Sequence, residues 1–294
     1  MKTFLFSLFA AALMLAACNS KSTGAADVKK DDPATSGNHA AELNDLTGAG
    51  KMRDVLCQNW EYKEDLEELR RTGSEDIVYR GFSLYADGTM MKDPHGYFKT
   101  GKWKLDESVK PIRLSFVFDN GEAEEWELAY LKLRELRLVR KGDPGKTNVE
   151  LAALGQNFKD PYQDPFYPAN NMWRYKPPKP ETDAEIHKRF KAFLHFFILY
   201  YEKEIATETD IITFEGFPSC FKWYRGGIHL KKEKELGSRW FDCFYNPEQA
   251  MKAYGFADKL LTKRYNWPKN ERSWLKMNVA VLKQMEARAD SLSL

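Results

Sequence analysis

The sequence has little net charge, few cysteines and no apolar run long enough to span a membrane as a helix. Lys and Arg number 45 against 43 Asp and Glu, which leaves a formal net charge of +2. Nucleic-acid-binding domains cluster Lys and Arg and have a pI above about 9. The balance here therefore predicts no nucleic-acid partner. A spanning helix needs about 20 apolar residues, and no run in the chain reaches that length.

The sequence also lacks the short motifs that mark several enzyme classes. It contains no Gly-x-x-x-x-Gly-Lys-Ser/Thr phosphate loop, no Gly-x-Ser-x-Gly elbow and no His-Glu-x-x-His zinc motif. Neither Cys-x-x-Cys nor His-x₃-His occurs, and zinc sites need spacings of that kind. We therefore predict no metal, no cofactor and no catalytic residue.

The first seventeen residues follow the plan of a secretory signal peptide. Lys2 supplies the positive charge, and Phe4–Ala17 is an almost continuous apolar stretch that is too short to cross a bilayer. The run Leu15-Ala16-Ala17-Cys18 resembles the lipobox of bacterial lipoproteins. This resemblance implies cleavage before Cys18 and attachment of lipid to its sulfur. Several acyl chains then hold the protein on a membrane, because each buried CH₂ contributes about 0.8 kcal/mol.

Residues 18–50 are expected to form a flexible tether between the lipid and the folded part. The stretch is rich in Ser, Thr, Gly, Ala, Lys and Asp and contains no aromatic residue. Such a segment buries too little apolar surface to offset its chain entropy. Asn19 stands where lipoproteins retained at an inner membrane usually carry Asp. The resemblance therefore favours an outer-membrane location facing the periplasm.

Residues 51–142 have the period-two hydrophobic pattern of half-buried strands. Asp87-Gly88 and Asn120-Gly121 separate apolar runs, and Asn-Gly is the preferred dipeptide of a type I′ hairpin turn. Short strands at regular spacing predict a small antiparallel meander, closed or half-closed as a barrel. The expected strands cover residues 77–85, 97–105, 112–118, 126–128, 131–133 and 136–139.

This region resembles the lipocalin-like domains of bacterial lipoproteins. The residues that carry the resemblance are Leu56-Cys57-Gln58-Asn59-Trp60, Phe82, Asp87-Gly88-Thr89, Gly101-Lys102-Trp103 and Leu136-Arg137-Leu138. The usual opening Gly-x-Trp is replaced here by Gln58-Asn59-Trp60. The resemblance implies an up-and-down barrel and a small apolar ligand as a partner. Small barrels are also often filled by side chains, and we expect Trp60 and Trp103 in such a core.

Residues 143–180 are expected to form a proline-rich linker that straps the two parts together. Proline fixes φ and disfavours helix in the residue before it, so most of this stretch should be extended. A short helix is expected at 148–154. The aromatic residues that argue against a free linker are Phe158, Tyr162, Phe166, Tyr167, Trp173 and Tyr175.

In residues 181–294 the hydrophobic pattern changes to a period of 3.6 residues. This pattern predicts an α-rich domain, separate from the barrel. Thr182 and Glu185 have the spacing of a capping box, and apolar residues cover the whole circumference of 193–201, which predicts a buried helix. Asn246-Pro247 begins a second helix, and a third is expected after Pro268. The fold class is therefore α+β.

Three cysteines remain once Cys18 carries lipid, namely Cys57, Cys220 and Cys243. A disulfide between Cys220 and Cys243 would stabilise the fold by closing a loop. The alternative is three buried, reduced thiols, since free Cys is among the most buried residue types.

The run Trp223-Tyr224-Arg225 precedes two glycines and is a candidate for partner binding. Trp, Tyr and Arg are the residue types that dominate binding hot spots. The alternative is that these aromatic side chains pack on the neighbouring helices.

Taken together, these features predict a membrane-anchored envelope lipoprotein that acts as a non-enzymatic protein-interaction or assembly module. An envelope protein would then be its partner. A second hypothesis is a carrier that holds a small apolar ligand in the barrel. A third is a thiol-dependent enzyme that uses Cys220 with His229 and either Asp210 or Asp242, which would require an exposed thiolate.

Overall fold

The computed structural model describes residues 51–72, 80–142, 147–207, 217–224 and 227–292. The expected signal peptide, the lipid-bearing Cys18 and the tether lie outside these ranges and stay predictions. Among the described helices, none combines the length and the apolar character that crossing a membrane requires.

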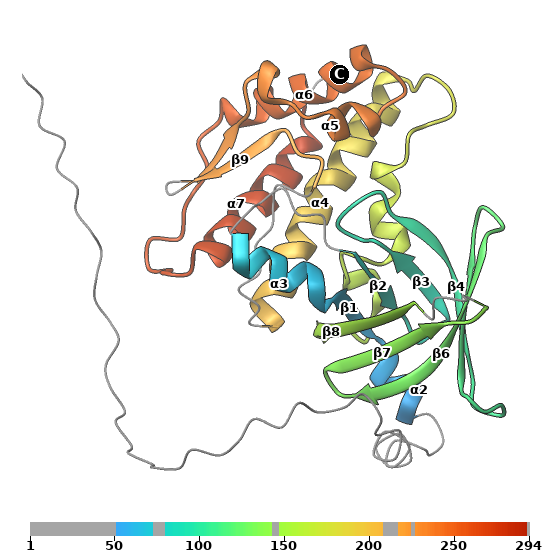
Figure 1. The fold of residues 1–294 in the computed structure, drawn as a ribbon. Helices are drawn as coiled ribbons and strands as arrows, with labels where there is room; N and C mark the ends of the chain where they lie inside the picture. The colour runs from blue at the N-terminus through green and yellow to red at the C-terminus, as the bar shows by residue number, and fades with distance from the viewer. Residues whose placement is uncertain (1–50, 73–79, 143–146, 208–216, 225–226, 293–294) are drawn as a thin grey trace, which may run out of the picture. The chain divides into compact units, whose positions relative to one another are not determined.

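Eight antiparallel strands form a closed barrel in which each strand pairs with the next and β8 pairs back to β1 (Figure 1). The predicted α+β fold, an antiparallel barrel followed by a helical region, is confirmed. The strands are β1 (Gln58–Tyr62), β2 (Gly81–Leu84), β3 (Thr89–Lys92), β4 (Lys99–Asp106), β5 (Arg113–Phe118), β6 (Ala123–Lys132), β7 (Glu135–Arg140) and β8 (Asn148–Gln156).

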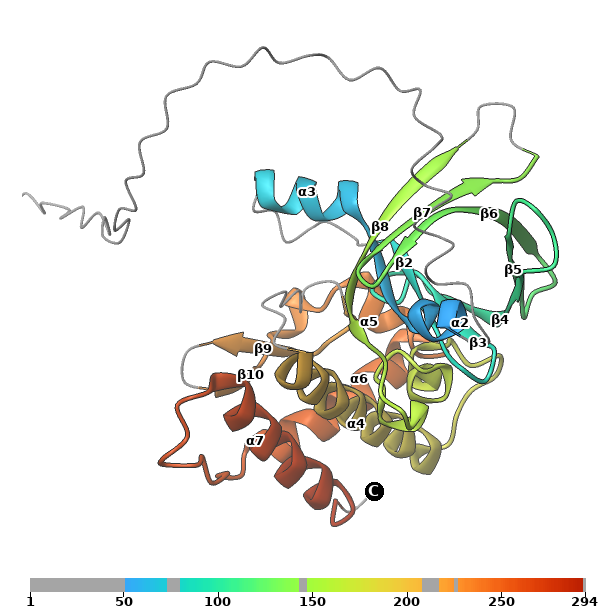
Figure 2. The ribbon, with the colours of Figure 1, turned by 90° about the horizontal axis from the view of Figure 1, so that it is seen from below.

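Side chains fill the inside of the barrel. Trp60 and Trp103 belong to its hydrophobic core, as expected, and are 0% and 4% exposed. Each buried indole N–H donates to a backbone carbonyl, Trp60 Nε1 to Leu56 O at 2.9 Å and Trp103 Nε1 to Tyr85 O at 2.8 Å. Helix α2 (Lys51–Leu56) packs against one end of the barrel and adds Met52 and Leu56 to this core (Figure 2).

Strand β8 replaces the short helix expected at 148–154. Its Leu-Ala-Ala-Leu run favours helix by intrinsic propensity. Val149 and Leu151 alternate toward the core and pair with Leu138 and Leu136 of β7, while the other edge of β8 pairs with β1. Two strand partners outweigh the local preference, so the barrel continues past the expected boundary at residue 142.

The turn between β5 and β6 differs from the expected type. A type I′ turn needs positive φ at both central residues. Gly121 has a φ of 87°, but Asn120 does not have positive φ. Gly121 N donates to Phe118 O at 2.9 Å, and this single left-handed residue lets the chain turn back into β6.

The proline-rich segment after β8, residues 157–180, which we call the strap, packs against both the barrel and the helices. It forms two short 3₁₀ helices, η1 (Pro161–Gln163) and η2 (Pro168–Arg174). Tyr167 donates to Asp87 Oδ2 of the barrel at 2.9 Å. The ring of Trp173 lies 5.1 Å from that of Phe193 in the helical region.

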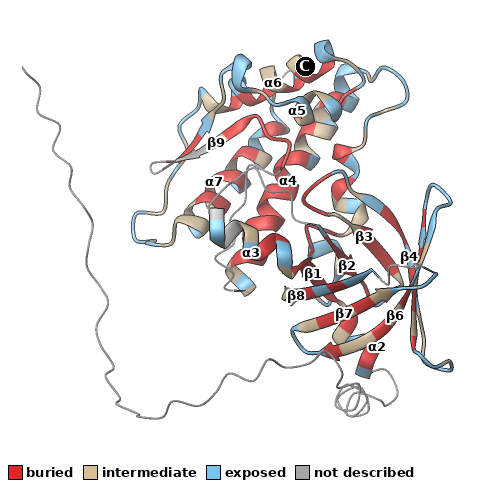
Figure 3. Ribbon diagram, viewed as in Figure 1, coloured by how far each residue is buried: buried red, intermediate tan, exposed pale blue. Residues whose placement is uncertain are grey.

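The helical region is built around α4 (Asp183–Thr207), which packs against α6 and α7 and is buried along much of its length (Figure 3). Its capping box is confirmed, because Thr182 N donates to Glu185 Oε2 at 2.7 Å and Glu185 N to Thr182 Oγ1 at 3.3 Å. The remaining elements are α3 (Lys63–Thr72) beside the barrel, β9 (Phe221–Tyr224), β10 (Gly227–Leu230), η4 (Glu233–Glu235), α5 (Ser238–Asp242), α6 (Pro247–Leu261) and α7 (Trp274–Ala289).

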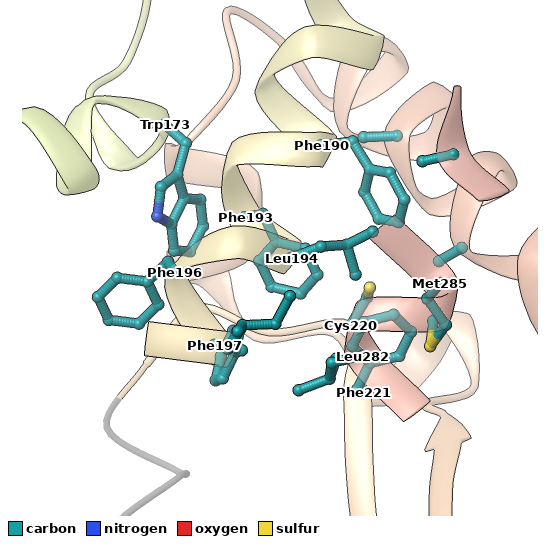
Figure 4. Packing of buried hydrophobic residues seen from close by; sticks show 14 of the residues in the cluster. Trp173, Phe190, Phe193, Leu194, Phe196, Phe197, Cys220, Phe221, Leu282 and Met285 are labelled. Carbon is teal, nitrogen blue, oxygen red and sulfur yellow. The ribbon is translucent and has the colours of Figure 1, made fainter. Parts of the chain in front are cut away.

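The N-cap predicted at Asn246 is confirmed, since its side chain accepts a hydrogen bond from Gln249 N. The third helix begins at Trp274, with Ser273 as its N-cap, rather than directly after Pro268. Phe193 lies in the middle of the helical core, where aromatic rings from several elements meet (Figure 4).

Candidate functional site

A cavity of about 310 Å³ lies where the loop between β3 and β4 meets the end of η2 and helix α5. Its walls come from residues 96–98 of the loop, residues 174–176, and Pro218, Arg239, Asp242 and Cys243. We call it the junction cavity. Ligand sites in proteins typically have volumes of roughly 300–1,000 Å³, so this cavity is suited to a small ligand.

The β3–β4 loop holds its shape through Asp93. This residue has a φ of 51°, a left-handed conformation in which Asp is one of the better tolerated side chains. Asp93 N donates to Gly81 O at 2.8 Å, Gly81 N donates to Asp93 Oδ1 at 3.1 Å, and Gly96 N donates to Asp93 O at 2.9 Å. The loop is therefore fixed at its start and at the first residue that lines the cavity.

A buried contact between a histidine and a carboxyl group fixes the centre of the same loop. His95 Nε2 lies 2.9 Å from Glu61 Oε1 of β1, and both side chains are almost fully buried. The imidazole also contacts the rings of Phe166 and Phe217, with centroids 4.9 and 5.3 Å away. The barrel, the strap and the helical region thus meet at one side chain, next in sequence to Gly96 of the cavity wall.

Arg174 is the most unusual residue of the cavity wall, because its guanidinium is buried without an acidic partner. Its Nη1 donates to Pro94 O at 2.8 Å and Asn171 Oδ1 at 3.1 Å, and its Nη2 donates to Gly96 O at 2.5 Å. Among the described residues, no carboxylate forms an ion pair with it. Burial accordingly lowers the pKa of Arg174 to about 10.

Aromatic rings surround this guanidinium. Arg174 Cζ lies 4.4 Å from the ring centroid of Phe98, and the edge of Tyr175 meets Phe98 at 4.6 Å. A second arginine follows the same arrangement on α5, since Arg239 Cζ lies 5.4 Å from the ring of Tyr97. Cation–π contacts of this kind stabilise a desolvated charge.

Lys176 also lines the cavity, so the described lining residues include three cationic side chains and one carboxylate, that of Asp242. The cavity walls are therefore both basic and aromatic.

No family model, curated protein or solved structure matches this chain. The chemistry of the junction cavity therefore has to be inferred from its own residues. Within the described ranges, no group of three or more His, Cys, Asp and Glu side chains is placed to hold a metal ion.

A second buried network joins the barrel, the strap and α4. Lys203 Nζ lies 2.5 Å from Asp164 Oδ2 and donates to Asn157 Oδ1 at 3.0 Å. Tyr85 donates its hydroxyl to Asp164 Oδ1 at 2.9 Å. Burial, followed by the charge of Asp164, raises the pKa of Tyr85 well above its usual range. All these groups have partners, which identifies the network as a structural joint between the barrel, the strap and α4.

The two cysteines of the expected disulfide are free thiols in the structure, and both are buried. The alternative of three buried thiols describes Cys220 and Cys243, whereas Cys57 is a free thiol that is only partly buried. Cys220 is 0% exposed in the helical core beside Phe221 (Figure 4). Burial raises the pKa of Cys220 beyond its usual range and that of Cys243 to about 12. A nucleophilic thiol needs the opposite shift, toward the thiolate.

Of the hypothetical thiol site, the described residues His229 and Asp242 are exposed, whereas Cys220 is buried. His229 is exposed on β10, where it pairs with Lys222, while Cys220 O accepts a hydrogen bond from Lys231 N. Asp242 is exposed on α5, and Asp210 lies outside the described residues. The geometry gives this site no support.

We expect Cys220 and Cys243 to resist alkylation in the folded protein and to react fully after unfolding. Both thiols are buried and protonated at pH 8, whereas alkylation needs an accessible thiolate. The measurement is iodoacetamide labelling at pH 8 without reductant, with and without denaturant, followed by peptide mass spectrometry. If both cysteines stayed unlabelled in denaturant and became labelled only after reduction, they would form a disulfide. That outcome would contradict the free-thiol arrangement.

The expected anchor residues Trp223 and Tyr224 lie on strand β9 rather than in a turn. Ile228 pairs with Trp223 and Gly227 with Tyr224 across the hairpin. Arg225 lies outside the described residues. The partner-binding role of this run stays a prediction.

Glu204, on α4 next to Lys203, is a buried carboxyl group, and burial raises its pKa to about 8. In the unfolded chain the same group titrates near 4.5. Between these two values the folded state binds more protons than the unfolded state, so stability falls as the pH rises from 4.5 to 8. Glu204→Gln should remove this loss.

The measurement is the free energy of unfolding of wild type and Glu204→Gln by urea titration at pH 5, 6.5 and 8. We expect the difference in favour of Gln to grow steadily across the series. Glu202→Gln, on the same helix and partly exposed, is the control. A difference that does not change with pH would mean that Glu204 is ionised throughout.

No direct signal in the sequence marks Arg174, Arg239 or Lys176 as ligand-binding residues. Each sits among aromatic residues in or beside a short helix, η2 or α5, and such short elements have no periodic pattern that separates a ligand-binding side chain from a surface one. Only Asp93-Pro94-His95-Gly96 carries a recognisable turn composition. Tyr97 and Phe98, which the alternation assigned to a strand, belong to this loop, because β4 begins at Lys99.

Proposed function

We propose that this chain is a lipid-anchored protein of the bacterial envelope that binds a small molecule without catalysis, and that the junction cavity is its binding site. The observation that carries the proposal is Arg174, a buried cation beside a cavity of ligand size. The lipobox-like run that ends in Cys18 supports the anchor, and Asn19 supports an outer-membrane location facing the periplasm.

A carrier role remains part of this proposal, but we place the ligand outside the barrel. The lipocalin-like resemblance supports a barrel of that kind, and lipocalin-like binding would use its interior. Trp60, Trp103 and Phe116 fill the core there. The junction cavity, in contrast, is open space with aromatic walls and the guanidinium of Arg174, whose hydrogen-bond acceptors are all neutral.

A protein-interaction role is a second proposal, favoured by Tyr97. This large side chain is 71% exposed and stands at the edge of the cavity. An envelope protein that inserted a side chain into the cavity would cover it.

The test uses the full-length lipidated protein, purified in mild detergent from its own envelope and examined by native mass spectrometry. We expect a small molecule bound in a one-to-one ratio. Tyr97→Ala, which removes part of the cavity wall at an exposed position, should lower the occupancy. Tyr162→Ala is the matched control, since Tyr162 is 61% exposed and does not line the cavity.

Retention of the small molecule by Tyr97→Ala would place the ligand elsewhere, in the barrel or another site. A protein recovered in a one-to-one ratio, with no small molecule, would favour the interaction module instead.

A further inference from the structure

The donors of Arg174 are only partly used. A guanidinium has five N–H donors, and three of them reach Pro94 O, Asn171 Oδ1 and Gly96 O. All three acceptors are neutral, so they satisfy hydrogen bonds but leave the positive charge uncompensated. A charge removed from water without an opposite charge costs free energy, and the lowered pKa of Arg174 has this origin.

Arg239 adds a second positive charge at the cavity, and this charge acts to lower the pKa of Arg174 further. Its Nη1 donates to His95 O at 3.5 Å, so both arginines are held by successive carbonyls of one loop. Asp242 lines the cavity but forms no ion pair with Arg174 in the described part of the chain.

From this arrangement we propose that the junction cavity recognises the anionic head of a small ligand, a carboxylate or a phosphate monoester, through Arg174 and Arg239. This inference rests on the proposed function, because it specifies the ligand of the same cavity. Guanidinium groups bind such heads by paired, charge-assisted hydrogen bonds, which are stronger than neutral ones. The anion supplies a negative charge that none of the three acceptors of Arg174 carries.

The rest of the cavity selects the body of the ligand. Phe98, Tyr175 and Pro218 offer apolar surface, and the thiol of Cys243 is protonated and weakly polar. A volume of about 310 Å³ leaves room for one or two rings or a short alkyl chain rather than a whole lipid. The ligand class is thus a small amphipathic acid with its head at the arginines.

The test compares probes that share one body and differ in charge. Isothermal titration calorimetry of the full-length protein in detergent would use 2-naphthoate, 2-naphthyl phosphate and the neutral 2-naphthamide. We expect at least one anion to bind about tenfold or more tightly than the amide, since charged hydrogen bonds exceed neutral ones by roughly that factor. The two anions distinguish a carboxylate head from a phosphate head.

Arg239→Gln should reduce the affinity for the preferred anion by about tenfold to a hundredfold and leave the amide unchanged. Arg71→Gln is the control, because Arg71 is an exposed arginine on α3, outside the cavity. Arg174→Lys keeps the positive charge but removes the planar guanidinium group, so it should weaken anion binding. The thermal unfolding midpoint of this variant reports whether it still folds.

The outcomes separate the inference from the proposed function. Equal affinity for acid and amide, with both lost in Tyr97→Ala, would overturn the anion inference and leave a binding cavity. Binding of none of the probes, together with no co-purified small molecule, would overturn both.

Discussion

Replacing Lys203 by Met should lower the free energy of unfolding by about 3 to 5 kcal/mol, the cost of breaking a buried ion pair on one side. The side chains of Lys203 and Asp164 are only 7% and 0% exposed. Met retains most of the apolar stem, so the loss comes mainly from the charge. Asp164 would keep its bonds from Tyr85 and from Phe166 N but lose the one cation that pairs with it among the described residues. Urea unfolding followed by circular dichroism measures the effect.

Lys191→Met is the matched control for this experiment. Lys191 lies on the same helix and pairs with Asp290, but Asp290 is largely exposed. Such surface pairs contribute only about 0 to 1 kcal/mol. A loss below 1 kcal/mol for Lys203→Met would show that water reaches Asp164 or that its carboxyl is protonated, and the joint would then not depend on charge.

Replacing Phe193 by Ala should have a similar cost, about 3 to 5 kcal/mol, through the cavity that it leaves. The Phe193 ring lies 5.1 Å from Trp173, 5.4 Å from Phe221 and 5.5 Å from Trp240, measured between centroids. These neighbours come from the strap, the hairpin and α5, so they cannot all move inward together. The vacated volume should remain largely empty.

Phe193→Leu should cost clearly less than Phe193→Ala, because Leu fills part of the volume. Tyr162→Ala, at an exposed position, should change stability by no more than about 0.5 kcal/mol. Equal losses for Ala and Leu at position 193 would contradict the cavity explanation. They would point instead to the ring contacts themselves as the source of stability.

Local signals in the sequence predicted much of the fold. The alternating hydrophobic pattern predicted most ends of strands β4 and β5 to within one or two residues. The cap residues Thr182 and Asn246 correctly predicted where two helices begin. These features depend on neighbours within a few residues, which the sequence displays directly. The buried character of α4 followed equally from the apolar residues on all its faces.

Features that depend on distant partners were not predictable in the same way. Helix α3 lies in a stretch assigned to sheet, and β8 was expected to be helical, because each is stabilised by residues far along the chain. Asp65 on α3, for example, accepts hydrogen bonds from Arg80. The junction cavity has the same origin, since Arg174 and Arg239 are separated by most of the helical region's sequence and are brought together only in the folded chain.

The closing of the barrel by β8 also sets an order of events during synthesis. Strand β1 can pair with β2 early, but its second edge has no partner until Asn148–Gln156 has been synthesised. Pairings across such long stretches of chain form slowly, and an open strand edge invites pairing with other chains. The nascent protein therefore passes through a period in which one edge needs protection. A fragment ended at residue 142 would remain in that state permanently.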